Sequence, residues 1–223
     1  RHFSIRPVTH REPVIPESFS EEINGNDKWV THMFKGKKGG YFIEAGACDG
    51  TFGSNTYALE LHYGWTGICV EPSDAFFEKL KVNRKCICVN CCLGDTKGTV
   101  KYIECENCYS GIADYLHAEK KEFWKDGTAK QKPLALLQDV LQENNAPRTI
   151  DYLSLDTEGS EYAILKNFPF DEYKILALTI EGNSCNSLLL SKGYIRVENP
   201  YNTGALWEQY FAHPDMVSSK PYL

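Results

Sequence analysis

The sequence predicts an α/β fold in which helices cover both faces of a mainly parallel β-sheet that ends in an antiparallel hairpin. Two observations predict it. Short apolar segments of strand length alternate along the chain with segments whose apolar residues recur at helical spacing. A glycine-containing turn follows the first apolar segment, as expected where a strand passes into a crossover helix.

Each expected element rests on its local pattern. The opening helix, residues 27–34, places Trp29, Val30, Met33 and Phe34 at helical spacing, and the Lys and Gly residues that follow end it. Further strands are expected at residues 41–45, 67–71, 86–90, 99–103, 152–156 and 175–181, and a last pair on either side of the turn at 199–204. Further helices are expected at residues 55–63, 73–83, 133–142, 161–167 and 184–192.

The amino-terminal segment differs from the rest. Residues 1–20 hold Pro7, Pro13 and Pro16 among charged residues without hydrophobic periodicity, which predicts an arm or an interdomain linker. Residues 21–223 then form one domain, which is large enough to bury its own core. The arm also suggests that the native chain continues upstream into another domain.

Composition excludes several classes of protein. With 42% hydrophobic and 24% charged residues, the chain is neither disordered nor collagen-like. The net charge is -6, and basic residues are scattered except for Lys35, Lys37 and Lys38, so nucleic acid is an unlikely partner. No run of apolar residues is long enough to span a membrane.

The nine cysteines indicate a reducing, cytoplasmic setting, because the count is odd and several lie in expected buried strands. A zinc site built from Cys105, Cys108 and the four cysteines of residues 86–92 is an alternative. Its spacings match no standard paired zinc knuckle, so small buried side chains are the favoured interpretation.

The most informative segment is residues 42–50, an apolar strand that runs into glycines and then a helix. In a parallel sheet, the ligand crevice lies beyond the carboxyl ends of the strands, where glycines let backbone N–H groups approach a ligand. The spacing is not G-x-G-x-x-G, which argues against a nicotinamide-dependent oxidoreductase. Glu44 and Asp49 favour a cationic or zwitterionic ligand over a pyrophosphate. A tight turn that binds nothing is the alternative.

The next expected strand ends in Glu71, Pro72 and Ser73, about 20 residues after the glycines. An acidic side chain at that point can accept two hydrogen bonds from a ribose diol, although it could also be a solvent-facing loop residue. Acids at the ends of the first two strands are the pattern expected for S-adenosylmethionine binding in Rossmann-like methyltransferases.

Five blocks of the sequence carry a family resemblance: residues 40–47 with Asp49 and Gly50; Ser54, Asn55 and Thr56 with Leu59 and Glu60; Gly64, Trp65 and Gly67; Glu71 and Pro72; and residues 151–161, which contain D-x-E-G-x-E. Over residues 26–183 the chain resembles the FkbM-type S-adenosylmethionine-dependent methyltransferases. The resemblance implies a class I methyltransferase fold with a seven-stranded sheet, S-adenosylmethionine as methyl donor, and O-methylation as the usual chemistry.

The resemblance also implies which residues contact the cofactor. Glu44 to Gly50 would shape the methionine side, Glu71 would hold the ribose, and Cys91 and Cys92 would line the adenine. The full set of cofactor residues is Glu44, Gly46, Ala47, Cys48, Asp49, Gly50, Ser54, Asn55, Glu71, Pro72, Ser73, Cys91 and Cys92. Cys48 stands where many class I enzymes have a second motif glycine.

Catalysis is expected where the fourth core strand ends, because Asp156 and Glu158 lie over the crevice. Glu158 and Glu161 would share the first turn of the next helix, so either could instead cap that helix. His213 is an additional candidate base.

A divalent cation is a further expectation. Asp156, Glu181 and Asn183 would bring oxygen ligands from adjacent strand ends together, the set that Mg²⁺ prefers, as in catechol-type O-methyltransferases. The alternative is metal-free general-base catalysis by Asp156 or Glu158, with Asn183 orienting the acceptor.

The acceptor pocket is expected to use Tyr109, Ser110, Trp124, Tyr201 and Trp207, with Asn183. Aromatic rings beside hydroxyl and amide groups suit a sugar, so the sequence predicts an O-methyltransferase of a sugar or glycan. The alternatives are a small phenolic, lipid or natural-product acceptor, or a degenerate cofactor-binding domain that serves as an interaction module.

Overall fold

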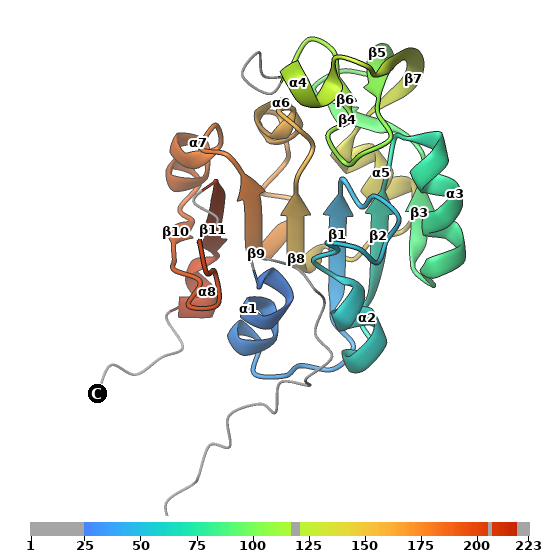
Figure 1. Cartoon of the computed structure of the whole chain (residues 1–223). Coiled ribbons are helices and arrows are strands. Elements are labelled where there is room, and N and C mark those ends of the chain that lie inside the picture. Colours follow the sequence, from blue (N-terminus) through green and yellow to red (C-terminus); the bar gives the residue numbers. More distant parts are fainter. Residues whose placement is uncertain (1–24, 117–120, 205–206, 218–223) are drawn as a thin grey trace, which may run out of the picture.

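The computed structural model describes residues 25–116, 121–204 and 207–217 of the 223-residue chain. The expected arm, residues 1–20, lies outside these ranges. Within them, the strands form a seven-stranded sheet in the order β10-β11-β9-β8-β1-β2-β3 and a four-stranded sheet in the order β4-β7-β5-β6. Figure 1 shows the smaller sheet above the tips of the central arrows of the larger one.

The larger sheet has the predicted architecture. Neighbours from β3 to β9 pair in parallel, while β11 is antiparallel to both β9 and β10. Its strands are β1 (Tyr41–Ala45), β2 (Thr66–Val70), β3 (Ile87–Val89), β8 (Thr149–Leu155), β9 (Lys174–Glu181), β10 (Ile195–Arg196) and β11 (Glu208–Ala212). The carboxyl ends of the parallel strands therefore meet at one edge, where a ligand crevice is expected.

Helices pack against both faces of this sheet because its strands alternate their side chains between two cores. In β1, Phe42 joins the core that contains Trp29 and Leu59, whereas Ile43 joins the core that contains Leu141. The first core is covered by α1 (Asn26–Met33), α2 (Tyr57–Tyr63) and α3 (Asp74–Asn83), and the second by α5 (Leu137–Glu143), α6 (Glu161–Leu165) and α7 (Asn186–Ser191). This confirms the mainly parallel, doubly covered sheet with its terminal hairpin.

The smaller sheet is the main departure from the sequence prediction. It consists of β4 (Cys92–Gly94), β5 (Gly98–Glu104), β6 (Gly111–Ile112) and β7 (Thr128–Leu136), and α4 (Lys121–Trp124) precedes β7. The helix expected at residues 133–142 is wrong over its first four residues, because Pro133 to Leu136 continue β7. These residues form a strand because β7 pairs with β5, which is distant in the sequence. The local spacing of apolar residues does not indicate this pairing.

The chain closes with α8 (Pro214–Val217). All nine cysteines are free thiols. Among the helices of the described ranges, none is both long and apolar enough to cross a membrane.

Candidate active site

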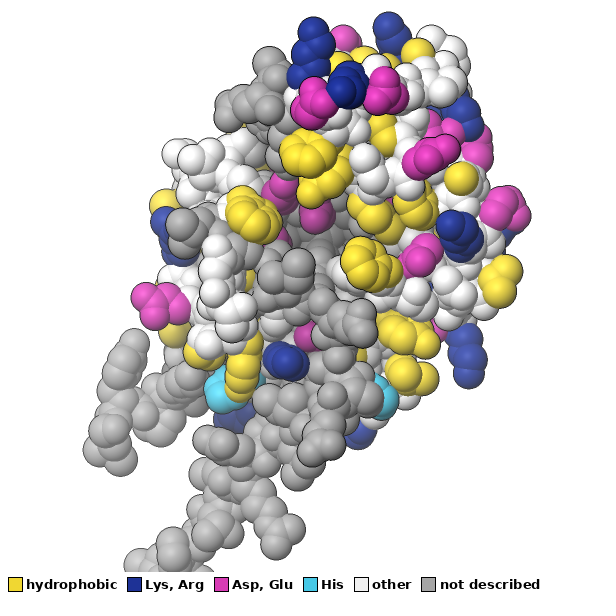
Figure 2. Space-filling model, viewed as in Figure 1, with side chains coloured by type: hydrophobic (Ala, Val, Ile, Leu, Met, Phe, Trp, Pro, Cys, Tyr) yellow, Lys and Arg dark blue, Asp and Glu magenta, His cyan; other side chains and the backbone are white. Residues whose placement is uncertain are grey.

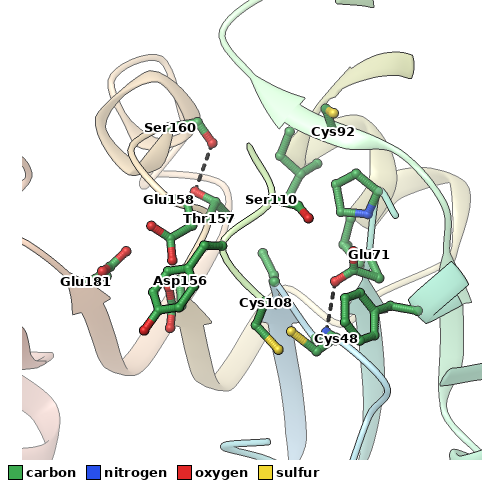
Figure 3. A pocket seen from close by; sticks show the side chains of 18 of the residues that line it. Cys48, Glu71, Cys92, Cys108, Ser110, Asp156, Thr157, Glu158, Ser160 and Glu181 are labelled. Carbon is green, nitrogen blue, oxygen red and sulfur yellow. Dashed lines mark hydrogen bonds between the residues drawn. The ribbon is translucent and has the colours of Figure 1, made fainter. Parts of the chain in front are cut away.

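A cavity of about 480 Å³ opens at the carboxyl ends of β1, β2 and β8, between the two sheets. Its volume lies in the range of small-molecule and cofactor sites. In Figure 3, Glu71 and Cys48 lie on one side of this cavity and Asp156, Glu158 and Glu181 on the other. The cavity therefore has two chemically distinct ends.

The close approach of two loops forms the floor of the cavity. The Asp156 N–H donates to the Ala45 carbonyl oxygen at 3.1 Å, which brings the end of β8 to the end of β1. Gly46 has φ +85°, and a Cβ atom there would lie 1.8 Å from the Asp156 carbonyl oxygen. Only glycine fits this position, so the glycine turn positions Asp156 as well as forming the loop.

Glu44 lies behind this loop and does not line the cavity. Its carboxylate accepts hydrogen bonds from the Ser54 hydroxyl at 2.8 Å and the Thr56 hydroxyl at 2.5 Å. The buried Arg84 guanidinium pairs with Glu44 at 3.3 Å and donates to the Gly50 carbonyl oxygen at 3.1 Å. Glu44 therefore fixes the shape of the loop from behind and is not among the residues that line the cavity.

Glu71 lies at the end of β2 and faces the cavity. One carboxylate oxygen accepts the Cys48 N–H at 2.8 Å and the other accepts the Ser73 N–H at 2.7 Å. Burial raises the pKa of Glu71 to about 8, and the two backbone donors only partly oppose it. Each oxygen keeps a second lone pair for an incoming hydroxyl donor.

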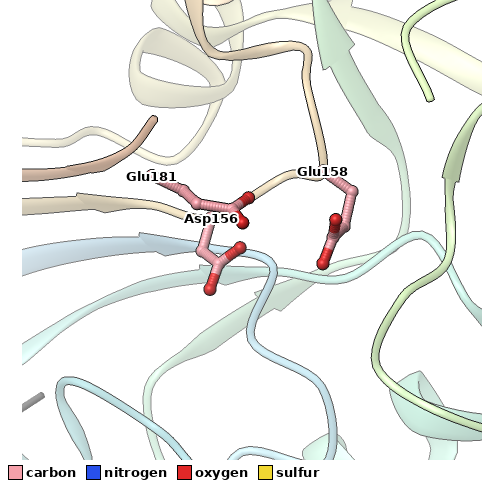
Figure 4. A group of neighbouring side chains, drawn as sticks. All are labelled: Asp156, Glu158 and Glu181. Atoms are coloured by element: carbon pink, nitrogen blue, oxygen red, sulfur yellow. The ribbon is translucent and has the colours of Figure 1, made fainter. Parts of the chain in front are cut away.

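At the other end of the cavity, Asp156, Glu158 and Glu181 each place an oxygen atom within 4.8 Å of the others'. Figure 4 shows the three carboxylates turned toward a common point. Asp156 is open to the solvent of the cavity, and the surrounding protein atoms together with the nearby charges of Glu181, Glu208 and Glu158 raise its pKa above its usual range. Among the described residues that line the cavity, none is a Lys or Arg. This end of the cavity suits a proton acceptor or a cation.

The loop after β8 is held by Glu161. Its carboxylate accepts hydrogen bonds from the Thr157 N–H at 2.8 Å and the Gly159 N–H at 3.2 Å. The capping interpretation therefore applies to Glu161. Glu158 has a left-handed backbone at φ +57°, a conformation that a non-glycine residue rarely adopts, and its side chain lines the cavity.

Aromatic side chains surround the cavity mouth. Tyr109 and Phe123 stack with their ring centroids 4.4 Å apart. Phe52 and Trp207, which also line the cavity, are 70% and 57% exposed. Figure 2 shows hydrophobic side chains gathered on this face around a recess in which acidic side chains are visible. Large exposed apolar side chains around a polar recess are typical of a binding site.

The structure brings most of the sequence-predicted site residues to this cavity. Those that line it are Gly46, Ala47, Cys48, Ser54, Glu71, Pro72, Cys91, Cys92, Tyr109, Ser110, Asp156, Glu158, Glu181 and Trp207. Several others support its walls from behind: Asp49 accepts backbone N–H groups in the loop, Asn55 donates to Ser154, and Ser73 caps α3. Gly50 anchors Arg84, as described above.

His213 is not brought to the site. β11 runs antiparallel to β9, with Glu208 opposite Glu181, so the chain moves away from the cavity along β11. His213 follows this strand, about 16 Å farther along. Its N–H donates to the Leu176 carbonyl oxygen, at the amino-terminal end of β9. The direction of β11, which the sequence does not determine, places His213 too far from Asp156 to act as a base in the cavity.

Three other expected residues also lie outside the cavity lining. Asn183, expected in the cation set, is exposed before α7. Glu158, expected as a base, is the third member of the acidic cluster with Asp156 and Glu181. The Tyr201 hydroxyl contacts His32 near α1. Trp124 is replaced at the cavity by its neighbour Phe123.

Sequence reasoning missed several lining residues, namely Phe52, Phe76, Tyr102, Cys108, Phe123, Thr157 and Ser160. Phe52 lies inside the glycine-rich loop and Thr157 inside D-x-E-G-x-E, so their position in the motifs was an available signal. Tyr102 and Cys108 line the cavity only because the smaller sheet lies over the larger one. No local pattern in the sequence indicates this arrangement of the two sheets.

Comparison with known proteins identifies the family. The family model described as Methyltransferase FkbM domain matches residues 44–190, which includes the glycine turn, Glu71 and the acidic loop. The chain belongs to the FkbM methyltransferase family. Methyl transfer is the reaction of this family, and S-adenosylmethionine is in general its methyl donor.

A solved structure of an FkbM methyltransferase shares the fold. The chain is similar to the FkbM methyltransferase from Methylobacillus flagellatus KT, with a TM-score of 0.50, 14% sequence identity, and coverage of 82% of this chain and 47% of that one. It therefore spans about half the length of this relative. A human methyltransferase 10 domain containing protein gives a TM-score of 0.42 at 15% identity, covering 83% of this chain and 77% of that chain. No curated protein matches the sequence.

Proposed function

We propose that this FkbM domain transfers a methyl group from S-adenosylmethionine to a hydroxyl oxygen of a sugar or glycan. One observation carries the proposal: a single cavity at the carboxyl ends of β1, β2 and β8 holds Glu71 at one end and the Asp156 cluster at the other. The first end suits a ribose and the second suits the activation of a hydroxyl group.

The cofactor would occupy the end bounded by the glycine turn and β2. Gly46 and Ala47 leave room for the methionine moiety, and Glu71 accepts hydrogen bonds from the ribose hydroxyls with its remaining lone pairs. Cys91 and Cys92, both buried, provide an apolar wall for the adenine. All of these residues line the cavity.

When bound, S-adenosylmethionine would supply an electrophilic methyl carbon for the acceptor hydroxyl, and its sulfur would keep the electron pair of the broken C–S bond. Asp156 is the group that accepts the proton of the attacking hydroxyl. Its raised pKa makes the Asp156 carboxylate a stronger base. Glu158 and Glu181, through their charges, hold the pKa of Asp156 in that raised range.

The same cluster offers a ligand set for Mg²⁺, because three carboxylates converge within 4.8 Å. Asp156, Glu158 and Glu181 would hold the ion, whereas Asn183 does not line the cavity. The metal-free mechanism and the metal-dependent mechanism predict opposite results of one experiment. Activity that survives exhaustive EDTA treatment unchanged supports the metal-free base, whereas activity lost to EDTA and restored by Mg²⁺ supports the metal.

The aromatic mouth supports a sugar acceptor. The faces of a sugar ring present C–H groups that stack on aromatic rings, and Trp207 and the stacked Tyr109 and Phe123 provide such surfaces. A phenolic acceptor would also stack there. A panel of monosaccharides, oligosaccharides and small phenols, assayed for methyl transfer, distinguishes the two, and transfer only to phenols would overturn the sugar assignment.

Thermal unfolding with S-adenosylhomocysteine, the demethylated product, tests the cofactor assignment, with NAD as control. A ligand at 100 times its dissociation constant adds about 2.7 kcal/mol to the free energy of unfolding. We expect a raised Tm with S-adenosylhomocysteine and none with NAD. Binding without transfer to any acceptor of the panel would favour an interaction module instead.

A further inference from the structure

The thiols of Cys48 and Cys108 both lie in the cavity, although they come from segments next to different sheets. Cys48 follows β1 of the larger sheet, and Cys108 lies between β5 and β6 of the smaller one. Both side chains line the cavity, and Figure 3 shows their sulfur atoms next to each other. The two thiols lie close enough for each to shift the pKa of the other. The pair therefore links the floor of the cavity to its roof.

Each thiol is held in place by its own loop. The Cys48 N–H donates to Glu71 at 2.8 Å, and the left-handed backbone at Cys48, φ +47°, fixes the direction of its side chain. On the other side, the Ser110 hydroxyl accepts the Cys105 N–H at 2.9 Å and closes the turn that carries Cys108. Both thiols are therefore presented to the same part of the cavity.

The two thiols differ in chemistry. The neighbouring Cys108, burial and the charge of Glu71 together raise the pKa of the Cys48 thiol well above its usual range. The neighbouring Cys48 lowers the pKa of Cys108. Cys108 is also the exposed member of the pair. It is therefore the nucleophile that a peroxide meets first.

We propose that Cys48 and Cys108 form an oxidative modification site, in which a peroxide converts the two thiols to a disulfide that closes the cavity to the cofactor. The Cys108 sulfur attacks a peroxide oxygen, the O–O bond breaks, and a sulfenic acid forms with release of water or an alcohol. The Cys48 sulfur then forms the S–S bond and displaces the second oxygen as water. Two thiols lose two electrons and two protons, and one peroxide is reduced.

The disulfide would hinder cofactor binding because of where it forms. This step of the proposal rests on the proposed function. A disulfide holds its two sulfur atoms about 2.05 Å apart, which ties the roof segment to the loop beside Glu71. That space is where the methionine moiety would lie. Thiol–disulfide exchange with a small thiol reopens it, so the modification is reversible.

A second pair of thiols provides a matched control. The sulfur atoms of Cys69 and Cys86 lie 3.5 Å apart, but neither residue lines the cavity. Oxidation of that pair would leave the cofactor space unchanged. The Cys86→Ser variant removes it and keeps the proposed site.

The test oxidises purified protein with hydrogen peroxide and follows two readouts. Mass spectrometry of an unreduced proteolytic digest is expected to show a peptide pair linked through Cys48 and Cys108, lighter by two hydrogens. Calorimetry is expected to show S-adenosylhomocysteine binding weakened at least tenfold and restored by dithiothreitol. In Cys108→Ser, peroxide should not change the variant's own dissociation constant, whereas Cys86→Ser should respond like the wild type.

Absence of the linked peptide would overturn the site. A linked protein that binds S-adenosylhomocysteine as tightly as the reduced protein would overturn the closure, as would an equal loss in oxidised Cys108→Ser. Failure of the proposed function is recognised separately, because reduced wild-type protein would then not bind S-adenosylhomocysteine at all, while the digest still decides the disulfide.

Discussion

Two groups of ionisable side chains lie on opposite sides of the glycine turn, and they differ in their partners. Behind the turn, the Arg84 guanidinium pairs with Glu44 at 3.3 Å and with Glu60 at 2.6 Å. In front of it, Asp156 faces other carboxylates, and its pKa is raised. Charges matched by an opposite charge hold the loop, whereas like charges gathered around a cavity are poised for proton transfer. The contrast separates a structural role from a chemical one.

The largest expected effect comes from Asp156→Asn, which removes the proton acceptor while keeping its shape. We expect methyl transfer to fall by roughly 10²–10⁴-fold. The dissociation constant for S-adenosylhomocysteine should change less than threefold, and stability should not fall because a like charge is removed. Turnover on an accepted sugar and calorimetry measure the two quantities. Asp171→Asn, on the exposed surface, is the control, and unchanged turnover in Asp156→Asn would contradict the assignment.

The structural side of the contrast is tested by Arg84→Met. Removing one partner of a buried pair leaves Glu44 without its compensating charge, so the free energy of unfolding should drop by about 3–5 kcal/mol. Urea unfolding measures it. Arg148→Gln breaks the exposed pair with Glu172 and should cost less than about 1 kcal/mol. Equal losses in the two variants would show that the buried network does not hold the loop.

Glu71 predicts a pH dependence of stability. Its pKa in the folded protein is about 8, above its ordinary value of 4.5. The folded state therefore holds a proton that the unfolded chain has released, and its contribution to stability is lost as pH rises between these two values. The loss is at most about 1.4 kcal/mol per pH unit.

Urea unfolding between pH 5.5 and 8.5 measures this slope in the ligand-free protein. We expect Glu71→Gln to reduce the slope, since the amide does not titrate, while the raised pKa of Asp156 keeps its own share of it. The exposed Glu78→Gln provides the control and should keep the wild-type slope. If Glu71→Gln retained the full slope, the burial of Glu71 would not be its source.

The smallest effect concerns the aromatic mouth. Trp207→Ala should raise the KM for a sugar acceptor by roughly 2–12-fold, because one aromatic stacking contact contributes about 0.5–1.5 kcal/mol. Its affinity for S-adenosylhomocysteine should remain that of the wild type. Tyr162→Ala, an exposed aromatic outside the cavity lining, is the matched control. Steady-state kinetics with varied acceptor decides, and an unchanged KM would remove Trp207 from the acceptor site.

Local pattern in the sequence was enough for the larger sheet and for the acids at its edge. An apolar strand followed by glycines, and strands ending at Glu71, Asp156 and Glu181, indicate a crevice because parallel strands end at a common edge. The family resemblance, carried by the same blocks, agrees with the matched family model. These features are short-range, so one sequence determines them.

Tertiary structure alone decided the rest. Pairing of β7 with β5 turned Pro133 to Leu136 into strand, and placed a second sheet whose loops bring Cys108 over the cavity. The antiparallel direction of β11 carried His213 away from Asp156. Glu44 was expected to contact the ligand, but it pairs with the buried Arg84 and supports the loop. Each outcome depends on residues far apart in the chain, and their packing is not encoded in any local spacing.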